Sequence, residues 1–109
     1  MIRRLTDGEL GWLREQRRLA IDAGRRADDA MREFDRLNVD FKERAALNGW
    51  SRQDNPTVYN EVKSQDLDLR DAYDDTIFWQ DVATRRAALI QMFVAVAEVE
   101  GQAQKWSSA

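Results

Sequence analysis

The residues with the most evident capacity for chemistry are aspartates between positions 66 and 81. Asp68 and Asp71, and likewise Asp71 and Asp75, are three and four residues apart, so on a helix their carboxylates share one face. Such a face could bind a hard cation or a basic partner. A calcium loop is not expected, because Arg70 stands at the fifth position counted from Asp66, where an oxygen donor is needed. We therefore interpret the cluster mainly as a solvated helix face, with binding of a metal ion or a basic partner as the alternative. The residues of this predicted acidic face are Asp68, Asp71, Asp74 and Asp75.

The composition argues against catalysis. The chain has neither cysteine nor histidine, so it lacks the commonest general base and the commonest metal ligand. Di-iron helical bundles use Glu-x-x-His motifs, and a nucleophilic serine needs a neighbouring base, so neither chemistry is provided for. We predict that the protein is not an enzyme and that it has no catalytic residues, no cofactor and no metal site.

The charge distribution argues against nucleic acid as a partner. Residues 1–50 contain eleven basic and ten acidic side chains, and residues 51–109 contain six and ten. The arginines of the first half have acidic residues four positions on, as in Arg18 with Asp22 and Arg36 with Asp40, so no broad basic surface is expected. The longest apolar run, residues 87–97, is too short for a membrane span, which needs about 20 residues. We expect a protein in the cytoplasm, or within a particle assembled there.

The elements that position these residues are predicted to be helices. Thr6 and Glu9 have the spacing of a capping box, which predicts a helix over about 7–47. Asn48-Gly49 is typical of a helix C-terminus, and Asn55-Pro56 of a new start after a turn over about 48–55. A second helix is predicted over about 56–105. The fold class is therefore all-α: one domain, 1–109, formed by two long antiparallel helices in a coiled-coil-like hairpin.

The apolar spacing of both predicted helices supports this hairpin. The seam of the first is Leu10, Leu13, Arg17, Ala20, Gly24, Ala27, Met31, Phe34, Asn38, Phe41 and Ala45, and that of the second is Val58, Val62, Leu69, Tyr73, Ile77, Ala83, Ala87, Ile90, Val94 and Ala97. Folding the chain at the turn predicts that position i lies near position 104 − i. The polar stretch 63–66 interrupts the second seam, and a three-helix fold with a break there is the structural alternative.

The most informative feature is a surplus of apolar residues at the open end of the hairpin. Almost every residue from Ala87 to Val99 is apolar, although one helical partner covers only a stripe of about 100°. Leu5, Trp12 and Leu19 repeat every seven residues, off the main seam. We predict an interface with another chain, anchored by Trp12 and Phe93. The alternative is that the termini fold back, with Met1-Ile2 and Trp106 covering the patch. The residues of this predicted interface are Leu5, Trp12, Leu19, Leu89, Met92, Phe93, Val96 and Val99.

The sequence thus favours a non-catalytic module for protein–protein interaction and assembly. Its partner would be a second copy, giving a homo-oligomer, or a larger assembly on which it docks. An oligomeric scaffold, an adaptor or a component of a larger particle, such as a phage structural or accessory protein, would suit these features. The alternative function is a small regulatory or inhibitory binder whose acidic stretch 66–81 occupies a basic site on a target protein.

Overall fold

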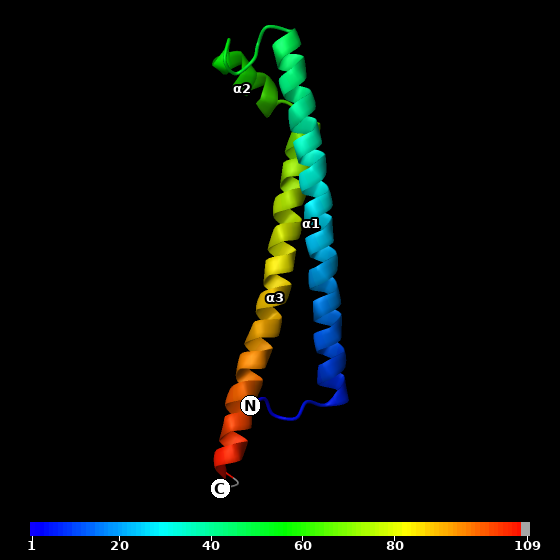
Figure 1. Ribbon diagram of the computed structural model, residues 1–109, viewed down its shortest axis with the longest axis vertical. Coiled ribbons are helices and arrows are strands. Elements are labelled where there is room, and N and C mark those ends of the chain that lie inside the picture. The colour runs from blue at the N-terminus through cyan, green and yellow to red at the C-terminus, as the bar shows by residue number, and fades with distance from the viewer. Residues whose placement is uncertain (108–109) are drawn as a thin grey trace. The chain divides into compact units, whose positions relative to one another are not determined.

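The computed structural model describes residues 1–107 and confirms an all-α chain. Its helices are α1 (Asp7–Leu47), α2 (Pro56–Ser64) and α3 (Leu67–Ser107), shown in Figure 1. The chain divides into two compact units. We call residues 1–24 and 81–109 the terminal unit, and residues 25–80 the turn unit. Each unit contains one part of α1 packed against one part of α3.

The predicted ends of α1 are confirmed. At its N-terminus the Glu9 amide donates to Thr6 Oγ1 over 3.1 Å, and the Thr6 amide donates to Glu9 Oε1 over 3.0 Å, which completes the capping box. At its C-terminus Gly49 has a φ of +74°. This left-handed conformation lets the Trp50 amide donate to the Ala45 carbonyl over 3.0 Å. The last turn of α1 therefore leads Trp50 back toward the core.

The continuous second helix over 56–105 is wrong, and the three-helix alternative with a break at 63–66 is confirmed. Asn55 caps α2 by accepting from the Val58 amide, and Pro56 occupies the first turn, as predicted. The Ser64 hydroxyl donates to the Glu61 carbonyl over 2.7 Å, and Asp66 Oδ1 accepts from the Leu69 amide over 3.1 Å. Short polar side chains here bond to nearby backbone groups and so replace helix continuation with a helix end and a new cap.

The core of the turn unit is the reason for the short helix α2. Tyr59 of α2 is buried against Phe41 of α1, with ring centroids 5.2 Å apart and planes nearly perpendicular. Trp50 contacts the same Phe41 ring at 5.3 Å. Val62 packs against this cluster, as the folding register predicted for Phe41. Leu69 of α3 belongs to the same core cluster. Four segments of the turn unit thus meet around one aromatic ring, which is almost fully buried.

α1 and α3 run antiparallel within each unit, close to the predicted register. In the turn unit Arg26 lies over Trp79 and Phe34 contacts Tyr73, while in the terminal unit Trp12 contacts Phe93. Each of these pairs lies within three residues of the 104 − i rule. The hairpin prediction is therefore confirmed at the level of individual side-chain pairs.

Four of the predicted seam positions are off by one residue. Gln16 and Ala23 are buried where the prediction had Arg17 and Gly24. On α3, Ala72 and Thr76 are buried, whereas the predicted seam residues Tyr73 and Ile77 are about half exposed. Small side chains at the contact allow the two helix backbones to approach closely, and the bulky neighbours are then left on the flanks. The buried Thr76 hydroxyl donates to the Ala72 carbonyl over 2.9 Å, so its polar group is satisfied.

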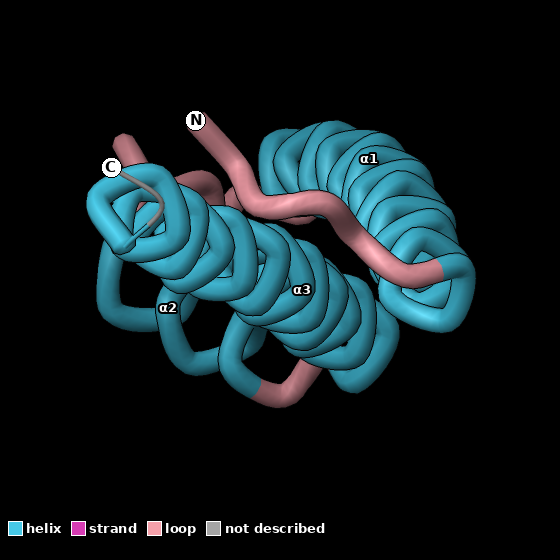
Figure 2. Tube along the Cα trace, turned by 90° about the horizontal axis from the view of Figure 1, so that it is seen from below, coloured by secondary structure: helices cyan, strands magenta, loops and turns pink. Residues whose placement is uncertain are grey.

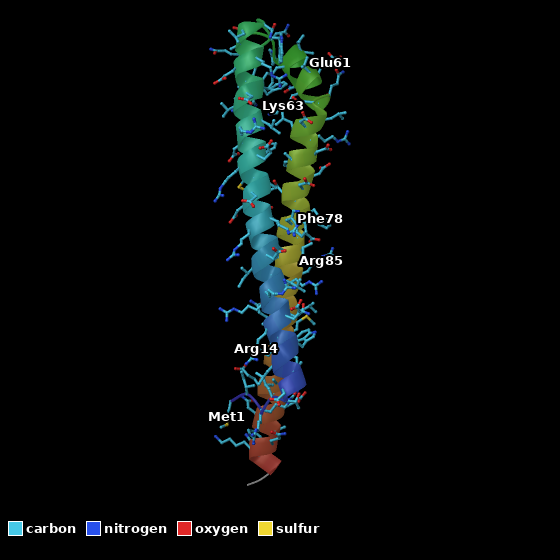
Figure 3. All side chains as sticks on the ribbon, turned by 90° about the vertical axis from the view of Figure 1, so that its right-hand side faces the viewer. Met1, Arg14, Glu61, Lys63, Phe78 and Arg85 are labelled. Atoms are coloured by element: carbon cyan, nitrogen blue, oxygen red, sulfur yellow. The ribbon has the colours of Figure 1, made fainter. Side chains whose placement is uncertain are left out.

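An extended N-terminal segment completes the terminal unit. It runs from the start of α1 to the C-terminal part of α3, as Figures 1 and 2 show from two directions. The Arg3 amide donates to the Ala97 carbonyl over 3.1 Å. Gly101 of α3 is buried beneath the segment, and a Cβ at this position would collide with the carbonyl oxygen of Met1. Figure 3 likewise places Met1 beside the C-terminal part of α3.

Candidate protein interface of the terminal unit

Two parallel stripes run along α3 in the terminal unit. We call Arg86, Ile90, Phe93 and Ala97 the inner seam, because they are buried or half-buried. The outer seam is Leu89, Met92, Val96 and Val99, which are 41%, 65%, 56% and 66% exposed. The spacing of the outer seam is three, four and three residues, and Arg85 extends it by a further step of four. A seam with this period matches the surface of another α-helix.

The position of the outer seam follows from helix geometry. Each inner-seam residue is directly preceded by Arg85 or by an outer-seam residue, namely Leu89, Met92 or Val96. One residue is a rotation of about 100° around an α-helix, so the outer seam faces sideways from the contact with α1. The inner seam is occupied by this chain, whereas the outer seam is left to solvent.

α1 adds aromatic and aliphatic surface to the same side. Trp12 and Leu19 directly precede the seam positions Leu13 and Ala20. Because the two helices are antiparallel, residues that precede the seam on either helix fall on the same side of the pair. The contact between the Trp12 and Phe93 rings, with centroids 5.5 Å apart, agrees with this geometry. Trp12 remains 38% exposed.

The structure places all eight residues of the predicted interface in the terminal unit. Leu89, Met92, Val96, Val99 and Trp12 are exposed, whereas Phe93, Leu5 and Leu19 are half-buried. The role of these residues as an interface stays a prediction. We name the eight residues together the apolar face.

The alternative, in which the termini fold back over the patch, describes only part of what the structure contains. The N-terminal segment does fold back, but it lies over Ala97 and Gly101, which continue the inner seam. Met1 and Trp106 themselves are more than four-fifths exposed. The fold-back therefore extends the packing started by α1 and leaves the outer seam uncovered.

Arg3 holds the N-terminal segment in place. Its guanidinium pairs with Glu9 of α1 over 2.5 Å and with Glu100 of α3, and it lies 5.9 Å from the centroid of the Phe93 ring. Hydrogen bonds from Arg3, together with those from Thr6, lower the pKa of the Glu9 carboxyl from its ordinary 4.5 to about 2. The two carboxylates raise the pKa of Arg3 in turn. One edge of the apolar face is thus formed by a three-residue ionic cluster.

A polar pair lies within the otherwise apolar seam of the terminal unit. Arg86 Nη1 donates to Gln16 Oε1 over 2.8 Å, and Gln16 is only 7% exposed. The sequence prediction missed this pair because it placed Arg17 in the seam. The signal was present, since Gln16 follows Leu13 by three residues and precedes Ala20 by four. A polar pair at a seam position favours one register of the two helices over the alternatives.

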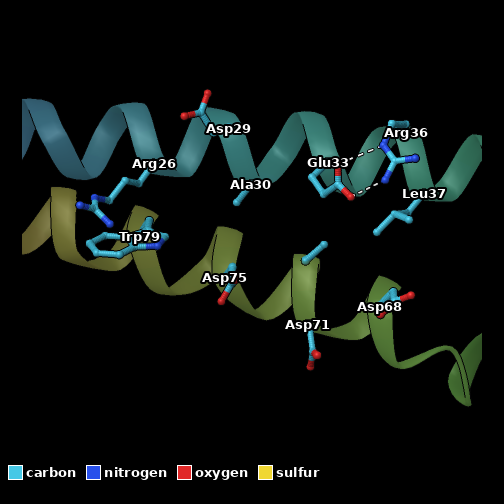
Figure 4. A pocket seen from close by; sticks show the side chains of 11 residues that line it. Arg26, Asp29, Ala30, Glu33, Arg36, Leu37, Asp68, Asp71, Asp75 and Trp79 are labelled. Atoms are coloured by element: carbon cyan, nitrogen blue, oxygen red, sulfur yellow. Dashed lines mark hydrogen bonds and ion pairs between the residues drawn. The ribbon is translucent and has the colours of Figure 1, made fainter.

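The predicted acidic face lies in the turn unit and is mixed in charge. Asp68, Asp71 and Asp75 line an open groove of about 650 Å³, whereas Asp74 does not. Arg26 and Arg36 of α1 line the same groove, with Arg26 4.7 Å from the centroid of the Trp79 ring. In Figure 4 the carboxylates of Asp71 and Asp75 point away from α1. Within the described part of the chain, no group of three or more acidic side chains is arranged to hold a metal ion.

A second exposed apolar group lies on α3 in the turn unit and was not predicted. Tyr73, Ile77 and Phe78 are each about half exposed, although Tyr73 also contacts Phe34 at 5.7 Å. The prediction assigned Tyr73 and Ile77 to the buried seam on the basis of size. The small residues Ala72 and Thr76, directly before them, were the signal that a closer helix contact was available.

Comparison with known proteins adds no family assignment. No protein-family model matches the chain, and no curated protein or solved structure is significantly similar to it. Among the helices of the described residues, none combines the length and apolarity needed to cross a membrane.

Proposed function

We propose that the protein is a non-catalytic helical assembly module that binds another polypeptide through the apolar face of its terminal unit. The observation that carries this proposal is the outer seam of α3, four large apolar side chains at helical spacing with 41% to 66% of their surface exposed. Contiguous apolar surface of this kind marks a contact site, because leaving it in water is unfavourable.

The chemistry of the face favours a protein as the occupant. From residue 87 to residue 97 α3 has no charged side chain, and Trp12 and Phe93 form an aromatic pair next to the outer seam. Interface cores are depleted in charge and enriched in aromatic residues and methionine. A scaffold, an adaptor or a component of a particle assembled in the cytoplasm, including a phage structural or accessory protein, would use a face of this kind.

Site-specific photo-cross-linking tests this proposal. In one variant a photoreactive amino acid replaces Met92 in the outer seam. In the control variant the same photoreactive amino acid replaces Gln91, which is exposed and points away from that seam. In cells that carry the gene, we expect covalent adducts with a polypeptide from position 92 and few from position 91. Adducts at neither position, or equal yields at both, would contradict a specific protein interface here.

The alternative function, an acidic binder that uses residues 66–81, stays a prediction. Three of its four candidate aspartates line one groove, which is the observation in its favour. Arg26 and Arg36 line the same groove and reduce its negative potential, although Asp29 and Glu33 also line it and leave acidic side chains in excess.

A further inference from the structure

The charged residues that precede and follow the outer seam along α3 have an unusual order of signs. Of these residues, Asp81, Arg85 and Glu100 lie on or beside the face of the outer seam, whereas Glu98 and Lys105 lie on the far side of the helix. Between residues 81 and 105 of α3 there are six charged side chains: Asp81, Arg85, Arg86, Glu98, Glu100 and Lys105. The first three have the signs minus, plus, plus, and the last three have minus, minus, plus. When the six charges are read from Lys105 back to Asp81, each sign is the opposite of the sign at the same place in the forward order. The centre of this pattern is near Phe93, within the uncharged run that carries the outer seam.

Such a sign order is self-complementary in only one orientation. Two copies of the segment in parallel place like charges together at both ends. Two antiparallel copies place plus against minus at both ends and bring the uncharged centres together. Opposite charges across a helix pair select partner and orientation, while like charges disfavour the wrong arrangement.

We propose that the occupant of the apolar face is a second copy of this chain, with α3 packed antiparallel on α3 about a two-fold axis near Phe93. This inference rests on the proposed function, because it names the partner of the same face. A two-fold axis makes the contact isologous, so the same residues are used on both copies and the assembly closes as a dimer.

The seam spacing fits this arrangement. With Met92 of one copy opposite Val96 of the other, Leu89 falls opposite Val99, and the four apolar residues of each copy are all used. In that register Glu100 of one copy lies within one helical turn of Arg85 and Arg86 of the other. The same contacts occur twice because of the two-fold axis. Trp12 lies beside Phe93 and so borders the centre of the interface.

The charged residues at the ends of the seam are well placed for this role. Arg85 is in line with the outer seam and pairs with Asp81 of its own helix over 2.9 Å, with both side chains more than half exposed. Glu100 pairs with Arg3 and keeps 47% of its side chain exposed. Both groups therefore have surface left for a second partner across the dimer axis. A lipid surface as occupant is disfavoured, since it would select basic residues alone at the flanks.

Charge exchange tests the antiparallel dimer in the full-length protein. The native chain is expected to change from its monomer mass of 12.7 kDa to twice that value as concentration rises from low micromolar to several hundred micromolar. Arg85→Glu or Glu100→Lys alone places like charges at both ends and is expected to raise the dimer dissociation constant about tenfold. The double variant restores opposite charges and is expected to return to within about threefold of the native value.

Three features of this design separate dimer contacts from folding effects. The ion pair of Glu100 with Arg3 is lost in both Glu100→Lys and the double variant, so its loss cannot explain a rescue. Gln91→Lys adds a charge to the same helix away from the seam and serves as the matched control, with dimerisation unchanged. Circular dichroism of each variant checks that the helix content is native. A double variant as weak as the single ones would overturn the antiparallel arrangement.

The orientation has its own test, since the native chain contains no cysteine. Ala95→Cys lies close to the proposed axis, and Gln102→Cys lies on the same flank one heptad further on. Antiparallel pairing predicts that oxidation yields a disulfide-linked dimer from Ala95→Cys but not from Gln102→Cys. Parallel pairing in register would give residues 95 and 102 the same separation from their counterparts in the second copy, so equal yields of linked dimer from the two variants would overturn the proposal.

The outcome also distinguishes this inference from the proposed function. Purified native protein that stays a monomer up to several hundred micromolar would overturn self-association. If Met92 then cross-links to a different polypeptide in cells, the proposed function stands with another partner. If Met92 yields no adduct either, both are contradicted.

Discussion

At the scale of single residues, the terminal unit depends on one arginine and one glycine. Arg3 joins α1 to α3 through Glu9 and Glu100, and its amide is bonded to Ala97. Gly101 provides the space in which this segment lies. Both residues act where the extended N-terminus replaces α1 as the partner of the inner seam.

Stability at low pH should depend on Glu9. Its pKa is about 2 in the folded protein and 4.5 ordinarily, so it favours the folded state above pH 4.5, and this contribution is lost as pH falls to 2. Glu15 and Glu33, whose pKa values are lowered by Arg18 and Arg36, act in the same direction. We expect Glu9→Gln to have a lower Tm than the native chain at pH 7, with the difference shrinking between pH 5 and pH 2. A difference independent of pH would show that Glu9 acts through packing and not through its charge.

Gly101→Ala should release the N-terminal segment. A Cβ at this position would collide with the Met1 carbonyl and lie 2.7 Å from the Arg3 nitrogen, both of which are backbone atoms. We expect the Arg3 amide to lose its protection from hydrogen exchange, even though alanine favours the helix by about 1 kcal/mol. Gly11→Ala is the matched control, because its Cβ would meet nothing within 4 Å. An Arg3 amide equally protected in both variants would contradict the close approach.

At the scale of elements, the break between α2 and α3 is what the turn unit is organised around. Ending α2 at Ser64 places Tyr59 against Phe41, and starting α3 at Leu67 places Leu69 in the same core. Asp66 lies between the two helices, where it caps α3 and also pairs with Arg44 of α1 over 3.2 Å.

Replacing Asp66 should separate its two roles. Asp66→Ala removes both the cap and the ion pair, and we expect it to lower the free energy of unfolding by about 1 kcal/mol, the usual cost of a lost N-cap. Asp66→Asn keeps a capping oxygen and should recover most of that loss, because the Arg44 side chain is more than half exposed and its ion pair is weak. Urea denaturation of the native chain and of both variants measures these changes in the free energy of unfolding. Equal losses in the two would assign the effect to the ion pair.

At the scale of the whole molecule, the sequence by itself determined the helical class, the capping box at Thr6, the turn at Gly49 and the hairpin register. These features depend on local chemistry or on the position of the turn. Residues that are neighbours in the sequence are enough to determine either of them. The sequence also indicated that the apolar surplus on residues 87–99 exceeds what one helix can cover, because an excess of this kind is visible from composition and period alone.

Only the tertiary structure decided which of two adjacent residues enters the seam. Alanines stand next to larger residues at several seam positions, so spacing alone could not choose between Ala72 and Tyr73, or between Gln16 and Arg17. The choice depends on how closely the two backbones approach, which is a property of both helices together. The same packing of α1 against α3 leaves the outer seam of α3 in solvent. It also leaves Ala97 and Gly101 to be covered by the N-terminal segment. The exposed surface of the terminal unit thus follows from packing, although the residues that form it were recognisable in the sequence.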